Sequence, residues 1–183
     1  RANGIVLVTG PTGSGKTTTL YSTLKYLAAE SVNVSTLEDP IEMVVDAFNQ
    51  SQIQPAIDFN FAAGIRTLMR QDPDIIMVGE IRDLETAEIA IKAAQTGHLV
   101  FSTLHTNDAP QSITRLMNMG VPTYNITSAV NLVIAQRLMR RLHKCKQPDD
   151  MPKEALLQAG FKEDEIDDLK IYKPVGCSDC NAG

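Results

Sequence analysis

A glycine-rich segment near the start of the chain matches the full pattern G-x-x-x-x-G-K-[ST]; it reads Gly10-Pro11-Thr12-Gly13-Ser14-Gly15-Lys16-Thr17. An apolar, β-branched run at residues 5–9 precedes it and predicts a buried strand, and a helical pattern over residues 16–29 follows it. The pattern binds phosphate groups when it lies between a strand and a helix. The chain is therefore expected to fold around a phosphate-binding loop.

The glycines of this loop let the backbone curl until successive N–H groups face inward. These groups and the positive end of the following helix can then bind phosphate oxygens. We expect Lys16 to contact the β- and γ-phosphates of ATP, and the Thr17 hydroxyl to ligate Mg²⁺. The residues expected to bind the nucleotide are Gly10, Pro11, Thr12, Gly13, Ser14, Gly15, Lys16, Thr17 and Thr18.

Apolar runs and helical patterns alternate along the chain as far as residue 141. Further strands are expected at 32–37, 75–78 and 99–104, and further helices at 59–71, 84–96, 109–118 and 123–141. Asp83 is expected to cap the helix that follows it. This alternation predicts an α/β fold with a mostly parallel sheet and helices on both faces. We expect the strand at 75–78 to lie beside the phosphate-loop strand.

Residues 143–183 differ from the rest because they contain all three cysteines and the acidic run 163–168. We expect residues 1–142 to form the α/β domain and residues 143–183 to form part of a small cysteine-containing subdomain. Three cysteines are too few for a disulfide scaffold and favour a reducing compartment, and a formal charge of −5 disfavours a nucleic-acid partner. No signal peptide opens the chain, and both ends look cut, which indicates a piece of a longer protein.

Acidic side chains follow two of the expected strands, at the sheet edge where parallel α/β folds bind ligands. Glu42 could orient or deprotonate the water that attacks the γ-phosphate, with a solvated acidic turn at Pro40 as the alternative. Glu80 comes just after the strand at 75–78 and is expected to reach the metal ion through a water molecule. For Glu80 the alternative is an acid that caps a helix.

Two histidines flank the expected strand at 99–104. His105 follows that strand and is expected to sense or stabilise the γ-phosphate, whereas His98 precedes it at the opposite end. A structural role is the alternative for both. Arg137, Arg140 and Arg141 are expected on consecutive turns of the last helix, where they would form a basic face for a protein partner.

The cysteines suggest a metal site. Cys177 and Cys180 form a C-x-x-C pair, and Cys145 and His143 lie upstream. Together the four could hold tetrahedral Zn²⁺ in a closed, structural site. The alternative is three free thiols.

Four segments, in this order, resemble the Walker A, Asp, Walker B and His boxes of the type II/type IV secretion ATPase superfamily. They are Gly10–Thr17, Thr36–Glu42, Asp72–Asp83 and Gly97–Asn107. The segments Leu104–Pro110 and Arg115–Pro122 are most similar to the type IV pilus assembly ATPases of that superfamily. The resemblance implies a RecA-like P-loop NTPase domain, followed by a truncated subdomain of the zinc-binding type.

This resemblance also implies roles for residues and partners. Glu42 matches the proposed general base, Glu80 the Walker B glutamate, and His98 and His105 the His box. The implied protein is a cytoplasmic homo-hexamer, peripheral to the bacterial inner membrane, which works with a platform protein and a docking protein. The chain departs from the family at His143-Lys144-Cys145, where one cysteine of the usual first C-x-x-C is missing.

Several functions remain open on the sequence alone. Type IV pilus assembly is the leading interpretation, and a type II secretion ATPase with the same chemistry is the closest alternative. A RecA-like DNA-handling motor and a nucleotide-binding scaffold without turnover are more distant alternatives. The fragment alone is expected to bind ATP and to hydrolyse it poorly.

Overall fold

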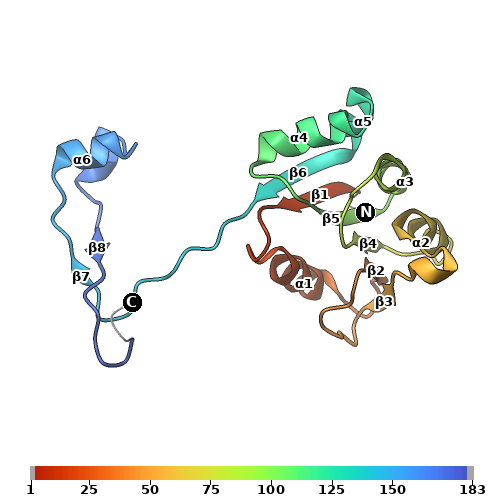
Figure 1. Ribbon diagram of the computed structural model, residues 1–183, viewed down its shortest axis with the longest axis horizontal. Coiled ribbons are helices and arrows are strands. Elements are labelled where there is room, and N and C mark those ends of the chain that lie inside the picture. The colour runs from red at the N-terminus through yellow and green to blue at the C-terminus, as the bar shows by residue number, and fades with distance from the viewer. Residues whose placement is uncertain (1–2, 181–183) are drawn as a thin grey trace. The chain divides into compact units, whose positions relative to one another are not determined.

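A six-stranded parallel sheet forms the centre of the first of two units in the computed structural model, which describes residues 3–180 (Figure 1). The two units are Arg1–Leu138 and Met139–Gly183. The strand order across the sheet is β3-β2-β4-β5-β1-β6. The strands are β1 (Gly4–Thr9), β2 (Val34–Glu38), β3 (Asn49–Gln52), β4 (Ile75–Val78), β5 (Leu99–Leu104) and β6 (Val130–Ala135).

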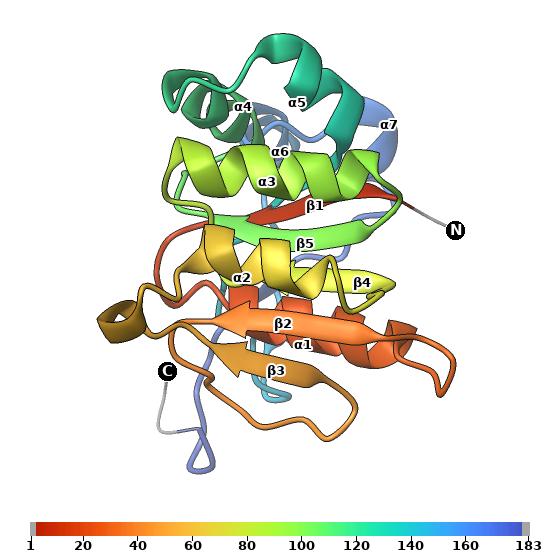
Figure 2. The ribbon, with the colours of Figure 1, turned by 90° about the vertical axis from the view of Figure 1, so that its right-hand side faces the viewer.

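Helices cover both faces of this sheet, as the sequence predicts (Figure 2). On one face, α1 (Lys16–Leu27) packs through Leu20 and Leu24 against strand residues such as Val8. The other face holds the larger core, which includes residues of all the remaining helices of this unit. Those helices are α2 (Phe61–Leu68), α3 (Leu84–Gln95), α4 (Ala109–Asn118) and α5 (Thr123–Ala129), and a short 3₁₀ turn, η1 (Pro55–Ile57), precedes them. The predicted cap of α3 is confirmed, because the Asp83 side chain accepts from the Thr86 amide at 2.7 Å.

The expected neighbour of the phosphate-loop strand is wrong. β5 lies between β1 and β4 and pairs in parallel with both of them. Side chains of β5 also reinforce its pairing with β4: the Ser102 hydroxyl donates to the Val78 carbonyl at 2.7 Å, and the Thr103 hydroxyl donates to the Gly79 carbonyl at 2.6 Å. The continuous apolar pattern of these strands predicts burial but does not specify their order.

The expected helix at 123–141 is also wrong beyond Ala129. The chain there turns into β6, which pairs in parallel with β1, and Arg137, Arg140 and Arg141 lie outside any helix. β-branched residues such as Val130, Val133 and Ile134 favour an extended strand, and β1 gains a partner on its second edge. β3 was not expected at all, since its sequence Asn-Gln-Ser-Gln has no apolar alternation.

The second unit is small. It contains an antiparallel pair, β7 (Gln147–Pro148) and β8 (Tyr172–Lys173), and two short helices, α6 (Lys153–Gln158) and α7 (Glu163–Ile166). Leu156 is the one apolar side chain that is buried among the described residues of this unit. Within residues 3–180, no helix combines the length and hydrophobicity needed to cross a membrane.

Close packing of α2 on β2 gives a stability test at Gly64. A Cβ atom at this position would lie 2.7 Å from Cδ2 of Leu37, which is fully buried. We expect Gly64→Ala to lower the free energy of unfolding by about 1–3 kcal/mol through overpacking, although alanine is the better helix former by about 1 kcal/mol. Chemical denaturation measures the change. Leu37→Val should recover part of the loss in the Gly64→Ala background, and a stabilised Gly64→Ala variant would contradict this packing.

Candidate active site and metal cluster

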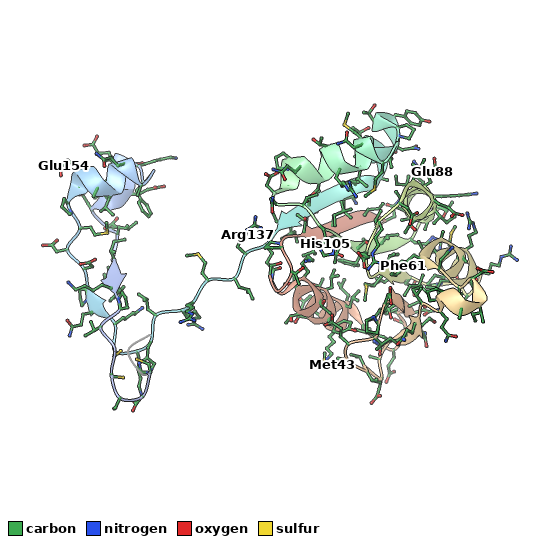
Figure 3. The ribbon with its side chains drawn as sticks, viewed as in Figure 1. Met43, Phe61, Glu88, His105, Arg137 and Glu154 are labelled. Carbon is green, nitrogen blue, oxygen red and sulfur yellow. The ribbon has the colours of Figure 1, made fainter. Side chains whose placement is uncertain are left out.

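A cavity of about 490 Å³ opens at the carboxyl ends of the central strands. It is lined by the loop after β1, the segment after β2, and the ends of β4 and β5. Residues expected from the sequence meet in it, among them Lys16, Thr17, Glu42, Glu80 and His105. Figure 3 labels His105 where β5 ends, together with Phe61, another residue of the cavity wall. Segments far apart in the chain thus converge on one site.

The phosphate loop has the backbone that its glycines predict. Gly10, Gly13 and Gly15 have φ values of 144°, 77° and 84°, which residues with a side chain rarely adopt. A Cβ at Gly10 would lie 2.4 Å from the Gln136 carbonyl oxygen, so the position has no room for a larger residue. The buried Ser14 hydroxyl has no hydrogen-bond partner among the described residues. The loop is therefore a cradle of polar groups built from main chain, as phosphate binding requires.

Lys16 lies across the mouth of this loop. Its ammonium donates to the carbonyls of Gly10 at 3.0 Å and Pro11 at 3.1 Å. Burial lowers the pKa of Lys16, and the charge of Glu80 opposes that shift. A partly desolvated cation in this position favours a negatively charged ligand.

Gln136 is a further residue that binds the loop, and the sequence did not reveal it. Its Nε2 donates to the Ser14 carbonyl at 2.6 Å, and its Oε1 accepts from the Thr19 hydroxyl at 2.8 Å. Its backbone amide donates to the Thr9 carbonyl at 2.8 Å. Gln136 follows β6, within the range 123–141 where the sequence predicts a helix, and no sequence pattern points to its contact with the loop.

Glu80 stands at the centre of a charged cluster. Its side chain is 14% exposed and pairs directly with Arg82, and its Oε2 lies 3.6 Å from Nε2 of His105. Arg82 also lies 3.9 Å from Asp39, and its hydrogen bond to Glu80 raises the pKa of the guanidinium. Nothing in the sequence singles out Arg82 among the arginines. The pairing holds the Glu80 carboxylate at the cavity wall.

His98 lies at the other end of β5, as its position before the strand implies, and it does not line the cavity. Its Nδ1 is 2.9 Å from the Ala93 carbonyl. The geometry of this chain therefore does not bring His98 to the site, and a catalytic role for it stays a prediction.

A second glutamate, Glu38, is the last residue of β2 and is buried at the cavity wall with 4% exposure. Its carboxylate accepts hydrogen bonds from the hydroxyls of Tyr21 and Thr36 and from the side-chain amide of Gln50. Burial, and next the bond to Glu38, raise the pKa of Tyr21 to about 12. Three donors occupy Glu38, whereas Glu42 is exposed beside it. The carboxylate of Glu42 is therefore more accessible to a proton from a water molecule than the carboxylate of Glu38.

In the second unit, four side chains gather into a candidate metal site. The ligand atoms of His143, Cys145, Cys177 and Cys180 all lie within 4.8 Å of one another. The Cys180 sulfur is 3.8 Å from that of Cys145 and 3.7 Å from that of Cys177, and the Cys177 sulfur is 3.6 Å from Nδ1 of His143. A tetrahedral ion with bonds of about 2.3 Å to sulfur requires sulfur atoms about 3.8 Å apart. The spacing and the donor set both fit Zn²⁺, with His143 as the fourth ligand.

The strand, phosphate loop and helix, with acids at the ends of neighbouring parallel strands, define a P-loop nucleotide-binding domain. The chain belongs to the Type II/IV secretion system protein family, whose model matches residues 1–183. The fold and family expected from the sequence are therefore confirmed.

Individual relatives agree with this assignment. The chain is 56% identical over 181 residues to the Type IV pilus assembly ATPase PilB of Pseudomonas aeruginosa, a match that covers 98% of this chain and 32% of the relative. It is 50% identical over 182 residues to the Type II secretion system ATPase E of Vibrio cholerae, covering 99% of this chain and 36% of that protein. A solved structure of the pilus retraction motor PilT with bound ADP has a TM-score of 0.67 and 43% identity, over 76% of this chain and 43% of that one. The chain spans about a third of the length of these two curated relatives.

The raised pKa of Tyr21 gives a test of the buried network. We expect the Tyr21 phenol to remain protonated at about pH 11, because its pKa is about 12 rather than the ordinary value of about 10. The neutral phenol thus adds stability below pH ~10 that is lost as the pH rises through about 12. Carbon-13 NMR of labelled tyrosine, assigned with Tyr21→Phe, measures the ionisation. Glu38→Gln should lower this pKa, and an ionised Tyr21 at pH 10–11 in the unaltered protein would contradict the network.

Proposed function

We propose that this chain is the ATP-hydrolysing part of a motor that powers type IV pilus assembly. The observation that carries the proposal is the single cavity in which the phosphate loop, Glu42, Glu80 and His105 meet. The identity to type IV pilus assembly ATPases supports the pilus as the structure it builds. The ADP bound to the similar retraction motor supports an adenine nucleotide as the ligand.

In this proposal the loop holds the nucleotide. The backbone N–H groups of the loop, of which Pro11 has none, and the Lys16 ammonium bind the β- and γ-phosphate oxygens. The Thr17 hydroxyl and the Glu80 carboxylate line the same cavity and are the hard oxygen donors that suit Mg²⁺, Glu80 through a water molecule. When bound, Mg²⁺ supplies positive charge that neutralises the phosphate oxygens.

Hydrolysis then needs a water molecule and a base. Glu42 accepts a proton from the water while the water oxygen attacks the γ-phosphorus. The bond from that phosphorus to the β–γ bridging oxygen breaks, which leaves ADP and phosphate. Glu42 suits this role better than Glu38, whose carboxylate already accepts three hydrogen bonds. His105 lies beside Glu80 and can donate a hydrogen bond to the γ-phosphate. Arg82 keeps Glu80 in position.

The assembly is also part of the proposal. By analogy with its relatives, we place the chain in a homo-hexamer in the cytoplasm, peripheral to the bacterial inner membrane. Its partners there are a platform protein and a docking protein of the pilus machine. The residues absent from this chain, about two thirds of each relative, would contribute to those contacts.

A type II secretion ATPase is the second candidate, because the chain is 50% identical to one such protein. The chemistry in the cavity would be the same. Complementation of deletion strains separates the two, since loss of pili and loss of secretion are distinct outcomes.

For the second unit we propose a structural Zn²⁺ site formed by Cys145, Cys177, Cys180 and His143. The closed set of four ligands leaves no coordination position for a substrate. The unit buries little apolar surface, so a bound metal would supply much of its folding free energy.

The proposed chemistry predicts a split between binding and turnover at Glu42. We expect Glu42→Gln to lower the rate of ATP hydrolysis by roughly 100-fold or more, because the proton of the attacking water loses its acceptor. ATP affinity should stay within about twofold, because the loop and Lys16 are intact. Phosphate release and calorimetric titration measure the two quantities in the intact protein. The exposed Glu30, in the turn after α1, provides the control Glu30→Gln, and equal turnover in both variants would refute the role of Glu42.

The metal site predicts one Zn²⁺ per chain. We expect Cys177→Ser to lower zinc affinity by roughly tenfold or more, because a thiolate ligand is lost. His143→Cys should retain the metal, since it keeps four ligands. Zinc content by mass spectrometry and the absorption of the Co²⁺ form measure binding. Asp179→Asn alters the same turn without removing a ligand, and it is the matched control; metal-free protein in every form would overturn the site.

A further inference from the structure

The unpredicted edge strand β3 places the side chain of Gln50 against the loop that carries Glu42, and Gln52 Oε1 accepts from the Ile41 amide of that loop at 3.4 Å. The Gln50 Nε2 donates to Oε1 of Glu38 at 3.0 Å and to the Met43 carbonyl at 3.0 Å. Its Oε1 accepts from the Val45 amide at 2.7 Å. A single side-chain amide therefore bonds a buried carboxylate and two backbone groups of the neighbouring loop.

That loop, residues 39–48, has no helix or strand to hold its shape. On its outer side Met43 and Val44 are 46% and 80% exposed, and Figure 3 labels Met43 there. On its inner side Val45 and Phe48 are buried, and the Phe48 ring lies 6.1 Å from that of Tyr21. Glu42 thus lies in the exposed stretch of the loop, immediately before Met43, whose carbonyl accepts from Gln50.

Gln50 also relates this loop to the helix that follows the phosphate loop. Tyr21 of α1 donates to Glu38, and Gln50 donates to the other oxygen of the same carboxylate. The chain of contacts runs from α1 through Tyr21, Glu38 and Gln50 to the backbone beside Glu42. The position of Glu42 is therefore set relative to the helix at the phosphate end of the cavity.

We infer that Gln50 is a positioning residue for the proposed hydrolysis: it holds the loop so that Glu42 faces the attacking water. This inference rests on the proposed role of Glu42. Only a side chain with both a donor and an acceptor makes this set of bonds. A carboxylate at position 50 would lie against Glu38, and an apolar side chain would leave the Met43 carbonyl and the Val45 amide without that partner.

Gln50→Met tests the inference, because it keeps the length of the side chain and removes the amide. In the intact protein we expect kcat for ATP hydrolysis to fall roughly 10- to 100-fold, since small displacements of a reacting group have effects of this size. ATP affinity should stay within about twofold. Gln54→Met, at an exposed position two residues after β3, is the matched control and should leave both quantities unchanged. Gln50→Ala provides a second variant if the methionine side chain disturbs folding.

A double-mutant comparison shows whether Gln50 acts through Glu42. In the Glu42→Gln background, Gln50→Met should lower kcat by less than twofold, because the base is already gone. An unchanged kcat for Gln50→Met alone, or the same large fall in both backgrounds, would overturn the inference.

Hydrogen exchange gives a readout that does not depend on turnover. Gln50→Met should accelerate exchange of the Val45 amide, which loses its acceptor, while amides of α1 keep their rates. If Glu42→Gln retains full turnover, the proposed function of Glu42 fails and the inference about catalysis falls with it. If instead Glu42→Gln is inactive but exchange at Val45 is unchanged in Gln50→Met, the inference alone fails.

Discussion

The common direction of the strands is the constraint on which the site depends. Because every described pairing in the large sheet is parallel, the carboxyl ends of its strands lie at one edge. The phosphate loop, Glu42, Glu80 and His105 each follow a strand, so the direction of the strands alone is enough to bring them to one edge of the sheet. An antiparallel neighbour in the centre of the sheet would send one of these side chains to the opposite edge, where His98 lies.

Buried polar groups then fix the geometry within that edge. Glu38 is surrounded by donors from α1, β2 and β3, and Glu80 is held by Arg82 and lies near His105. A buried carboxylate is stable only where hydrogen bonds or ion pairs compensate for the lost water, so each cluster restricts the elements that contribute to it. The apolar cores hold the layers together, and the polar clusters set the relative positions of the groups at the cavity.

Much of the fold and site could be predicted because it depends on local patterns. The loop motif, the capped α3 and the apolar strands are signals within a few residues, and they placed Lys16, Glu80 and His105 at one edge. What was missed depends on contacts distant in sequence. The sequence of β6 predicts a helix, and its strand conformation depends on pairing with β1. β3 is too polar to be predicted as a strand. Gln50 and Gln136 act through single amides that no periodic pattern reveals, and the position of β5 between β1 and β4 follows from pairing rather than composition.

The anchoring of the phosphate loop by Gln136 has a mechanical consequence. Gln136 bonds the loop at Ser14, and Leu138, two residues later, is the last residue of the first unit. Tension applied to the chain beyond Leu138 would load Arg137, which donates to the Asn107 carbonyl at 2.7 Å, and Gln136 before it could strain the sheet. Such tension would therefore act first on the phosphate loop and on the segment after β5, before it reached the strands.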